Sequence, residues 1–390
     1  MDLIIISELF PPEETSTAYI MGEIAKRLSS KYKVTVVCGP EVYDQNKVGV
    51  LPKSSLIEGI SVIRVKGVKE NKKKKYSRIR KFLLMSFHLY QAARKIIKKG
   101  DRVLLVSNPF PLLILMAYYR KKMDFNISFL AHDIFPEPLL MRFRMPSFVY
   151  NQCQRIFNKS YARMDKIISL GRDMTEVLRR KTVRYNPQLK IVQIENWGDI
   201  EQIYPKTSCP MRDKFVLQYA GNMGKAQNLE SLINIFVQTK NEELQLDIWG
   251  TGEQESCLKN IACSALNINF YGPYARESQN EVLNSCDIAI ICLNKAILGL
   301  GVPSKTYNIL ASGKPILYVG PLESEIAIMI LENKIGFCYD ADDYEGILTF
   351  LNRLNKDMRT ELFNMGMKAR KLVEDKYSKD IILQKFYNNI

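Results

Sequence analysis

The chain has 390 residues, of which 46% are hydrophobic and 25% are charged, and its formal net charge is +15. This length exceeds what one hydrophobic core usually serves, so we expect two domains of ordinary globular composition. The eight cysteines form no C-x-x-C pair and only two histidines accompany them, which argues against a zinc site and favours reduced cysteines in a reducing compartment.

The N-terminal stretch MDLIIISELFPP lacks a basic region and reaches a double proline, which is not typical of a secretory signal. The apolar stretch FPLLILMAYY has about half the length that a membrane span needs. We therefore expect a cytoplasmic protein.

In the first half of the chain, short apolar runs alternate with longer amphipathic ones. The short runs are LIIIS (3–7), KVTVVC (33–38), RVLLVS (102–107), ISFLAH (127–132) and KIISL (166–170). Each is typical of a buried strand, and the stretches between them have the period of helices. The alternation predicts an α/β domain with a parallel sheet covered by helices.

Positive charge is concentrated in residues 61–100, which hold fourteen Lys or Arg and one acidic residue, Glu70. A solvated helix face would explain this, and so would binding to nucleic acid or to an anionic membrane. Because the segment also carries bulky apolar residues such as Leu83 and Phe87, we favour a membrane surface over nucleic acid. We interpret His88, in the same segment, as a packing residue.

A second series of strands follows a stretch with little periodicity and two prolines, from about Trp197 to Arg212. The strands are KFVLQYAG (214–221), LQLDIWG (244–250), INFYG (268–272), DIAIIC (287–292) and KPILYVG (314–320). We expect a first domain over 1–197 and a second over 198–375, both doubly wound, with a ligand cleft between them. A last helix at about 376–390 is a candidate to pack back on the first domain.

Glycines at the ends of the second series predict close backbone approach to a ligand. Gly221 and Gly250 each end a strand and open a turn that leads into a helix, a favourable place for anions. The loop GLGVPSK places Lys305 in the first turn of a helix, where the helix dipole disfavours a cation unless an anion binds. We therefore expect a phosphate-bearing ligand, although a solvated lysine at an exposed helix start is the alternative.

In their order along nearly the whole chain, the strand-end motifs resemble those of GT-B glycosyltransferases of glycosyltransferase family 4. The resemblance is strongest to bacterial enzymes of O-antigen or capsular polysaccharide synthesis, the fucosyl- or N-acetylfucosaminyl-transferases. The motifs are LFPPEETSTAY, AHDIFPEPLL, ENWGDIEQIYP, YAGNMGKAQNLESLI, DIWGTGEQESCL, INFYGPY and GVPSKTYNILASGKPI.

This resemblance implies a GT-B fold, in which two Rossmann-like domains face a central cleft. It also implies a retaining hexosyl- or N-acetylhexosaminyl-transferase that uses a nucleotide-sugar donor, with UDP favoured over GDP, and no cofactor or obligatory metal. The acceptor would be a lipid-linked glycan of capsule or O-antigen biosynthesis. The basic segment would hold the protein on the anionic inner face of the cytoplasmic membrane, with no nucleic acid as partner.

The same resemblance suggests site residues. On the second domain the donor would contact Gly221, Asn222, Lys225, Gly250, Tyr271, Gly272, Tyr274, Gly299, Leu300, Gly301, Val302, Pro303, Ser304, Lys305 and Asn308. Lys305 would meet the diphosphate, with Lys225 as a second candidate, and Tyr271 and Tyr274 would lie near the base or in the core.

On the first domain, His132, Asp133 and Glu137 are candidates to reach the transferred sugar or the acceptor hydroxyl. A structural histidine, a capping aspartate and a surface glutamate are the alternative interpretations. Ser16 and Thr17, in the first loop, are candidates to lie near the diphosphate or to serve only the loop.

The chain also departs from the family pattern. Leu300 and Asn308 stand where the wider family carries two glutamates eight residues apart, and Asn222 and Gln227 replace an Arg and Lys pair. Asn308 retains the ability to bond a ribose hydroxyl, whereas Leu300 does not offer a carboxylate to the sugar. A non-catalytic sugar- or nucleotide-binding partner is therefore one alternative function. A nucleotide-sugar epimerase is the other, because such enzymes share the two-domain architecture.

Overall fold

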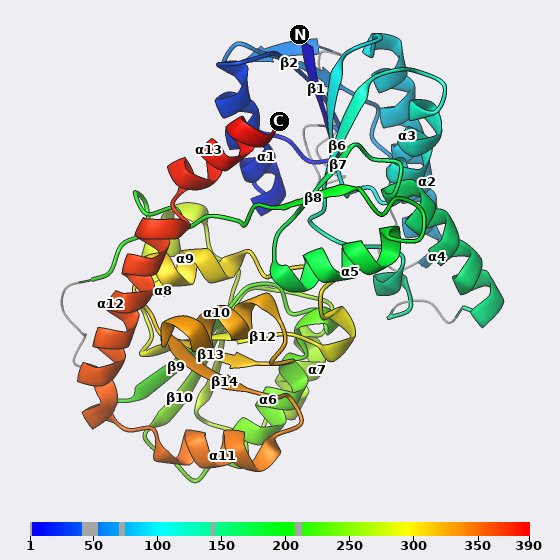
Figure 1. The fold of residues 1–390 in the computed structure, drawn as a ribbon. Helices are drawn as coiled ribbons and strands as arrows, with labels where there is room; N and C mark the ends of the chain where they lie inside the picture. Colours follow the sequence, from blue (N-terminus) through cyan, green and yellow to red (C-terminus); the bar gives the residue numbers. More distant parts are fainter. Residues whose placement is uncertain (1, 41–53, 70–74, 142–144, 207–212) are drawn as a thin grey trace. The chain divides into compact units, whose positions relative to one another are not determined.

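The computed structural model describes residues 2–40, 54–69, 75–141, 145–206 and 213–390, and the chain divides into two compact units (Figure 1). Unit 1 comprises Met1–Ile194 together with Leu383–Ile390, and unit 2 comprises Glu195–Ile382. Each unit has its own sheet with helices around it, so the predicted α/β class is confirmed.

Unit 1 contains an eight-stranded sheet in the order β3-β4-β2-β1-β5-β6-β7-β8. The strands are β1 (Asp2–Ser7), β2 (Lys33–Cys38), β3 (Ser54–Ile57), β4 (Ile60–Arg64), β5 (Arg102–Val106), β6 (Asn126–Leu130), β7 (Lys166–Ser169) and β8 (Lys190–Gln193). Neighbouring strands pair in parallel, except that β3 and β4 are antiparallel. The sequence did not predict this edge hairpin, whose two-residue turn places Glu58 and Gly59 at positive φ.

The helices of unit 1 lie between these strands along the chain. They are α1 (Ser16–Ser29), α2 (Lys75–Ile96), α3 (Leu112–Arg120), α4 (Ser147–Tyr161) and α5 (Arg172–Thr182), with a short 3-10 turn, η1 (Glu137–Leu139). The central strands are buried because helices cover the sheet, which explains their nearly continuous apolar sequences. Among the helices that the structure describes, we find none with the length and apolarity that crossing a bilayer requires.

Unit 2 contains a six-stranded parallel sheet in the order β11-β10-β9-β12-β13-β14. Its strands are β9 (Phe215–Ala220), β10 (Leu244–Trp249), β11 (Ile268–Gly272), β12 (Ile288–Cys292), β13 (Ile316–Val319) and β14 (Gly336–Tyr339). Its helices are α6 (Leu229–Phe236), α7 (Glu255–Ile261), α8 (Gln279–Leu283), α9 (Lys305–Ala311), α10 (Glu325–Asn333), α11 (Tyr344–Arg353) and α12 (Arg359–Lys376). The five predicted strands are present as β9 to β13, and β14 was not predicted.

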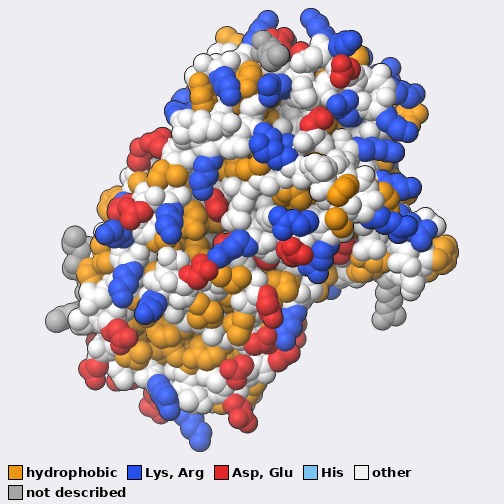
Figure 2. Space-filling view, viewed as in Figure 1, with side chains coloured by type: hydrophobic (Ala, Val, Ile, Leu, Met, Phe, Trp, Pro, Cys, Tyr) orange, Lys and Arg blue, Asp and Glu red, His pale blue; other side chains and the backbone are white. Residues whose placement is uncertain are grey.

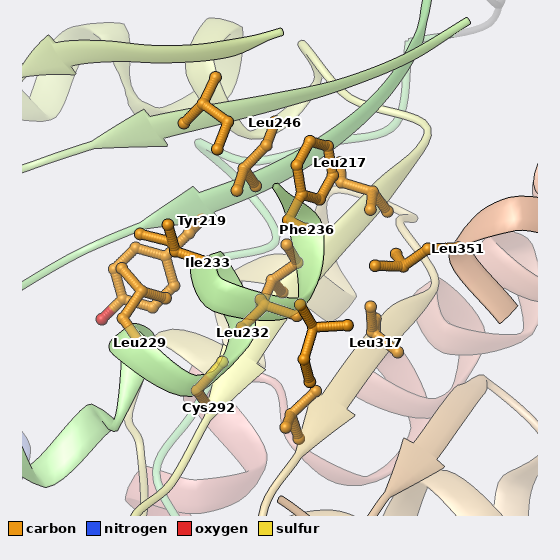
Figure 3. Close-up of a cluster of buried hydrophobic side chains, with 14 of the residues drawn as sticks. Leu217, Tyr219, Leu229, Leu232, Ile233, Phe236, Leu246, Cys292, Leu317 and Leu351 are labelled. Atoms are coloured by element: carbon orange, nitrogen blue, oxygen red, sulfur yellow. The ribbon is translucent and has the colours of Figure 1, made fainter. Parts of the chain in front are cut away.

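The core of unit 2 on one face of its sheet is formed by α6 and the strands beneath it. Figure 3 shows Leu232 and Phe236 of α6 among the side chains of the sheet, including Leu217 and Leu246. Tyr219 and Cys292 lie at the edge of this cluster and are both fully buried. The close packing fixes the two strands that carry them, β9 and β12.

The strand order of unit 2 reverses direction at β9, which pairs with β10 on one side and β12 on the other. In doubly wound sheets such a reversal leaves a crevice beyond the carboxyl ends of the two diverging strands, where ligands bind. In this unit the crevice is expected beyond Ala220 and Cys292. The equivalent reversal in unit 1 lies between β1 and β5.

The last helix, α13 (Lys379–Asn389), ends among cations of unit 1. Arg102 donates to the carbonyl of Ile390 at 2.7 Å and Lys31 donates to that of Tyr387 at 2.9 Å, while Lys166 bonds the carbonyl of Asn389. The final carbonyls of a helix have no partners within it and carry partial negative charge, so these cations stabilise the helix end. The last eight residues thereby belong to unit 1.

Candidate functional site

The turns that follow β9 and β10 pack backbone against backbone at the carboxyl edge of the unit 2 sheet. The N–H of Gly221 donates to the carbonyl of Trp249, and that of Met223 donates to the carbonyl of Thr251, both at 2.9 Å. Gly250 has φ of 119°, and a Cβ atom there would lie 2.0 Å from the carbonyl oxygen of Gly221. Only glycine fits this position, so the predicted close approach at Gly250 involves the neighbouring turn.

The segment after β12 bonds to the turn after β9. The N–H of Asn294 donates to the carbonyl of Ala226 at 2.8 Å, and its side-chain amide lies 3.3 Å from the carbonyl of Lys225. The chain then continues through residues 299–304 to α9, whose first residue is Lys305. Three segments that are distant in sequence are therefore held together at the topological reversal.

Lys305 reaches into this crevice. Its Nζ lies 3.5 Å from the centroid of the Tyr219 ring, and a Cβ atom on Gly221 would lie 3.5 Å from the same nitrogen. The nitrogen is buried and has no hydrogen-bond partner among the described residues. Burial lowers the pKa of Lys305 to about 7, because desolvation disfavours the ammonium.

The groups around Lys305 supply no negative charge that would offset this burial. Tyr219 is fully buried and its hydroxyl donates to the carbonyl of Asn222 at 2.6 Å. Burial also raises the pKa of the Cys292 thiol to about 12, so Cys292 is neutral at physiological pH. A buried lysine amine without a carboxylate is a candidate to receive an anionic ligand.

An aromatic group lies at the ends of β10 and β11. The rings of Trp249 and Tyr271 stack with centroids 4.4 Å apart, and Tyr274 meets Trp249 edge-on at 6.1 Å. Tyr271 keeps 47% of its surface exposed, and exposed aromatic surface is a candidate contact for a planar ligand. The indole Nε1 of Trp249 is buried and has no hydrogen-bond partner among the described residues. Gly272, with φ of 77°, ends this strand, and its carbonyl accepts from the N–H of Gly250.

The other residues predicted to contact the donor differ in their burial and hydrogen bonding. Leu300 is buried and its N–H donates to the carbonyl of Ile297, so neither its side chain nor its amide is directed to a ligand. The side-chain oxygen of Asn308 accepts from the N–H of Asp199 at 3.1 Å. The others, Gly299, Gly301, Val302, Pro303 and Ser304, form the loop that leads to Lys305. Asn222 and Lys225 are exposed on the turn after β9.

In unit 1, His132 and Asp133 follow β6 directly. The N–H of Asp133 donates to the Ser107 hydroxyl at 3.1 Å, which ties the ends of β5 and β6 together. The Nε2 atom of His132 is buried and has no partner among the described residues, and burial lowers the pKa of His132 to about 4. His132 is therefore a neutral imidazole at physiological pH. Desolvation by the surrounding protein raises the pKa of Asp133 above its usual value, although part of the residue is exposed to solvent.

Glu137 is engaged in an ion pair. Its carboxylate bonds the Lys181 ammonium of α5, a side chain that is only 7% exposed, and Gln154 of α4 lies 3.5 Å from the same oxygen. Desolvation lowers the pKa of Lys181 and the charge of Glu137 opposes that effect. The arrangement favours a structural role for Glu137 over proton transfer to a substrate.

Ser16 and Thr17 are the first two residues of α1. The N-terminal cap of this helix is Thr15, whose hydroxyl accepts from the N–H of Ala18 at 3.2 Å. Ser16 is exposed, and the loop thus has a clear local function in starting the helix.

Sequence reasoning missed four residues at these strand ends. Tyr219 and Cys292 lie within strands and resemble any core residue, and Trp249 immediately precedes Gly250 in the DIWG motif. Glu8 directly follows β1, at the reversal in unit 1, and its buried carboxylate lies 3.4 Å from Lys81 of α2. Each of the four lies at or near the end of an apolar strand, which was the available signal.

Within the part of the chain that the structure describes, no cluster of three or more His, Cys, Asp or Glu side chains is suited to hold a metal ion. The site in unit 2 instead presents one buried amine, an aromatic stack and several turns with closely packed backbones.

Comparisons with known proteins find similarities over the second half of the chain and over its whole length. Residues 200–372 match the family model described as glycosyl transferases group 1. The chain is 27% identical over 400 residues to a probable glycosyltransferase, WbjE, of Pseudomonas aeruginosa, covering 98% of this chain and 96% of the relative. It is 22% identical over 242 residues to a putative colanic acid biosynthesis glycosyl transferase, WcaI, of Escherichia coli K12, covering 58% and 57%.

Solved structures share the whole architecture at low sequence identity. Sucrose-phosphate synthase from Thermosynechococcus elongatus matches with a TM-score of 0.75 at 12% identity, covering 100% of this chain and 98% of that one. HepE from Anabaena, solved in complex with UDP, matches with a TM-score of 0.71 at 12% identity, covering 100% and 99%. At this identity the likeness concerns the fold, and it is that of two-domain GT-B proteins.

Proposed function

We propose that this chain transfers a sugar with retention of configuration. The premise is that the chain is a GT-B glycosyltransferase with a group 1 domain. The donor would be a nucleoside diphosphate sugar, with UDP favoured over GDP, and the acceptor a lipid-linked glycan of a bacterial surface polysaccharide. The relation to WbjE and to the colanic acid enzyme WcaI supports the biosynthetic setting. A neighbour in complex with UDP supports the class of donor.

The observation that carries this proposal is the amine of Lys305. It is buried at the topological reversal of unit 2, lies over Tyr219 and has no carboxylate partner among the described residues. Breaking a sugar–phosphate bond leaves negative charge on the diphosphate, and a fixed cation in a dry site stabilises that charge strongly. Lys305 fills this role in the proposed mechanism, and Lys225, on the turn after β9, is a second, more exposed contact.

The exposed surface of Tyr271 is the proposed contact for the nucleobase. Tyr271 is supported from behind by Trp249, so its ring is held flat without the donor. A preformed aromatic platform loses little side-chain entropy on binding a base. Stacking accepts uracil and guanine alike, and the preference for UDP therefore depends on polar contacts at the edge of the base.

In unit 1, the neutral imidazole of His132 is suited to bond a hydroxyl of the transferred sugar. Because burial keeps it uncharged, it can donate or accept a hydrogen bond without a cation beside the oxocarbenium-like sugar. A raised pKa makes the carboxylate of Asp133 a stronger base. Asp133 is therefore the proposed group that orients or deprotonates the acceptor hydroxyl. Glu137 has a structural role in this proposal because Lys181 occupies it.

The proposed membrane surface is the outer face of α2. Its inner face buries Met85, Leu89 and Ala93, whereas Leu83, Leu84 and Phe87 are exposed by 54%, 40% and 49%. Arg80, Arg94 and Lys95 are exposed along the same helix. Figure 2 shows many Lys and Arg side chains on the visible part of unit 1. An exposed apolar stripe with basic flanks suits the anionic interface where a lipid-linked acceptor resides.

Isothermal titration of UDP, GDP, ADP and CMP into the wild-type protein and Lys305→Ala tests the donor site. We expect one nucleoside diphosphate to bind, with an affinity at least tenfold lower in Lys305→Ala and unchanged in Lys368→Ala, which removes an exposed lysine of α12. If none of the nucleotides binds the wild type, the donor assignment is wrong.

The replacement of a family glutamate by the buried Leu300 favours one competing function, a protein that binds a nucleotide or sugar without turnover. Incubation with UDP- and GDP-sugars and analysis of the released nucleotide distinguish the two. Release that depends on a glycolipid acceptor supports a transferase, and binding without release supports the non-catalytic partner. Conversion of the donor to its epimer without release would support an epimerase.

A further inference from the structure

The amine of Lys305 lies in a pocket made by three elements. Its own helix α9 begins at Lys305, the ring of Tyr219 comes from β9, and Cys292 comes from the end of β12. Gly221, which follows β9, leaves the space that Lys305 occupies, because a side chain there would contact its terminal atoms. The nitrogen thus lies over one aromatic face and beside the backbone of Gly221, and it interacts electrostatically with the Cys292 thiol.

The titratable groups that face this nitrogen are neutral in the physiological range. The thiol of Cys292 and the phenol of Tyr219 both have pKa values raised by burial. The ring face of Tyr219 attracts an ammonium, but it offers no hydrogen-bond acceptor to replace the water that the ammonium has lost. Within the described residues, no acidic side chain pairs with Lys305.

A buried cation with neither a counter-ion nor an acceptor is costly, and a lysine avoids that cost by releasing its proton. We propose that Lys305 stands as an uncharged amine in the donor-free protein and takes up one proton from solvent when the donor's diphosphate binds. The inference rests on the proposed function, since it assigns the diphosphate to Lys305. In the bound state the new N–H bond belongs to an ammonium paired with phosphate oxygens, and the proton returns to solvent when the diphosphate leaves.

This mechanism has two consequences for the site. The empty crevice does not hold a permanent buried charge, and the cation forms only where a phosphate compensates it. The affinity for the diphosphate would also decrease about tenfold per pH unit above pH 7, until the raised pKa of the bound state is reached. Below pH 7 the affinity would not depend on Lys305 protonation.

The proton can be counted by isothermal titration of UDP and GDP at pH 8 in buffers of different ionisation enthalpy, such as HEPES, Tricine and Tris. At this pH the diphosphate is itself fully ionised, because its last pKa is about 6. With the pKa of Lys305 at about 7, most of the donor-free protein carries a neutral amine at pH 8, and we expect proton uptake on nucleotide binding.

Two variants attribute the proton to Lys305. Lys305→Arg carries its charge throughout, so it should bind the nucleotide with no proton uptake and with an affinity that is flat between pH 7 and 9. Lys305→Met has no charge in either state, and it should bind weakly with no uptake. Lys368→Ala, as the matched control, should show the uptake of the wild type. Circular dichroism of each variant verifies that it is folded.

The outcomes separate this inference from the proposed function. If no nucleotide binds the wild type, the proposed function fails. If one binds without proton uptake, or if Lys305→Arg retains the uptake, the donor site stands and the proton-coupled amine is wrong.

Discussion

The side-chain oxygen of Asn308 accepts a hydrogen bond from the backbone N–H of Asp199, with 3.1 Å between the two heavy atoms. Asn308 lies on α9 and Asp199 at the start of unit 2, where its own carboxylate lies 3.6 Å from Arg276. The residue that stands where the family pattern has a glutamate is therefore bonded within the protein. An amide in this position fixes the first residues of unit 2 against the helix that carries Lys305.

This bond predicts that Asn308→Ala destabilises the protein. Removing the acceptor leaves the N–H of Asp199 unsatisfied, which should cost about 1–2 kcal/mol in the free energy of unfolding. Urea denaturation measures that loss. A ribose contact would instead appear as weaker nucleotide binding at unchanged stability, so titration of UDP or GDP into the same variant decides between the two roles.

Replacing Lys305 by an apolar residue should stabilise the donor-free protein. Lys305→Met replaces a buried amine by an apolar side chain of similar length, and we expect a gain of about 1–3 kcal/mol at pH 7. The pKa of Lys305 is lower in the folded state, at about 7, than the ordinary lysine value of 10.5. Below pH 7 the folded state therefore bears the full cost of the buried ammonium, and this cost is relieved as the pH rises toward 10.5.

The advantage of Lys305→Met over the wild type should accordingly be largest at or below pH 7 and should shrink by about 1.4 kcal/mol per pH unit above it. Urea denaturation of both proteins from pH 6 to 9.5 measures this difference. A constant difference across that range would show that the amine titrates at an ordinary pKa.

Much of the fold could be predicted from the sequence, because buried parallel strands such as KVTVVC and DIAIIC are continuous apolar runs. The edge strands β3, β8 and β14 escaped this pattern, since they are short and only partly buried. Lys305 is a candidate that its loop sequence indicates. The surroundings of Lys305 could not be predicted, because Tyr219 and Cys292 come near it only through the pairing of β9 with β12.

The same limit applies to Glu137. Its place in the HDIFPE motif suggested chemistry, and its partner Lys181 is far along the chain on α5, so the ion pair was invisible in the sequence. The sequence pattern around Trp249 does not distinguish an indole that packs in the core from one that supports an aromatic platform. Its role emerges from the stacking on Tyr271.

The turn at Gly250 should tolerate no side chain. In Gly250→Ala the new Cβ would lie 2.0 Å from the carbonyl oxygen of Gly221, and φ of 119° is itself unfavourable for alanine. We expect a loss of at least about 3 kcal/mol in stability together with loss of nucleotide binding. Gly272→Ala is the matched control, because Gly272 also has positive φ but has open space around it.

Thermal unfolding of both glycine variants, with and without UDP or GDP, measures this effect. The control should lose about 1 kcal/mol, as expected from φ alone. Equal losses in the two variants would mean that the contact between the turns after β9 and β10 contributes nothing.

Glu137→Gln distinguishes a structural from a catalytic carboxylate. Because Lys181 is 7% exposed, removing its counter-charge should destabilise the protein by about 3 kcal/mol. The double variant Glu137→Gln/Lys181→Met should recover a substantial part of that loss, since it removes the unpaired charge. A catalytic Glu137 would give the opposite result, with sugar transfer abolished at unchanged stability and no recovery in the double variant.

The exposed stripe of α2 should determine binding to lipid. The double variant Leu83→Ser/Phe87→Ser removes two of its three large apolar side chains, and partial insertion of each is worth about 1 kcal/mol. Partition onto vesicles that contain anionic lipid should therefore fall at least about tenfold. Leu266→Ser, which alters a fully exposed leucine of unit 2, is the matched control and should leave vesicle binding unchanged.

Sedimentation with vesicles of phosphatidylglycerol and phosphatidylcholine, at low and high salt, measures this partition. The wild type should bind less at high salt, because exposed basic residues such as Arg80 and Arg94 supply the electrostatic part of the attraction. Nucleotide titration should give equal affinities for the wild type and the α2 variant, since the proposed donor site belongs to unit 2. If the wild type fails to sediment with anionic vesicles, α2 is an ordinary solvated helix.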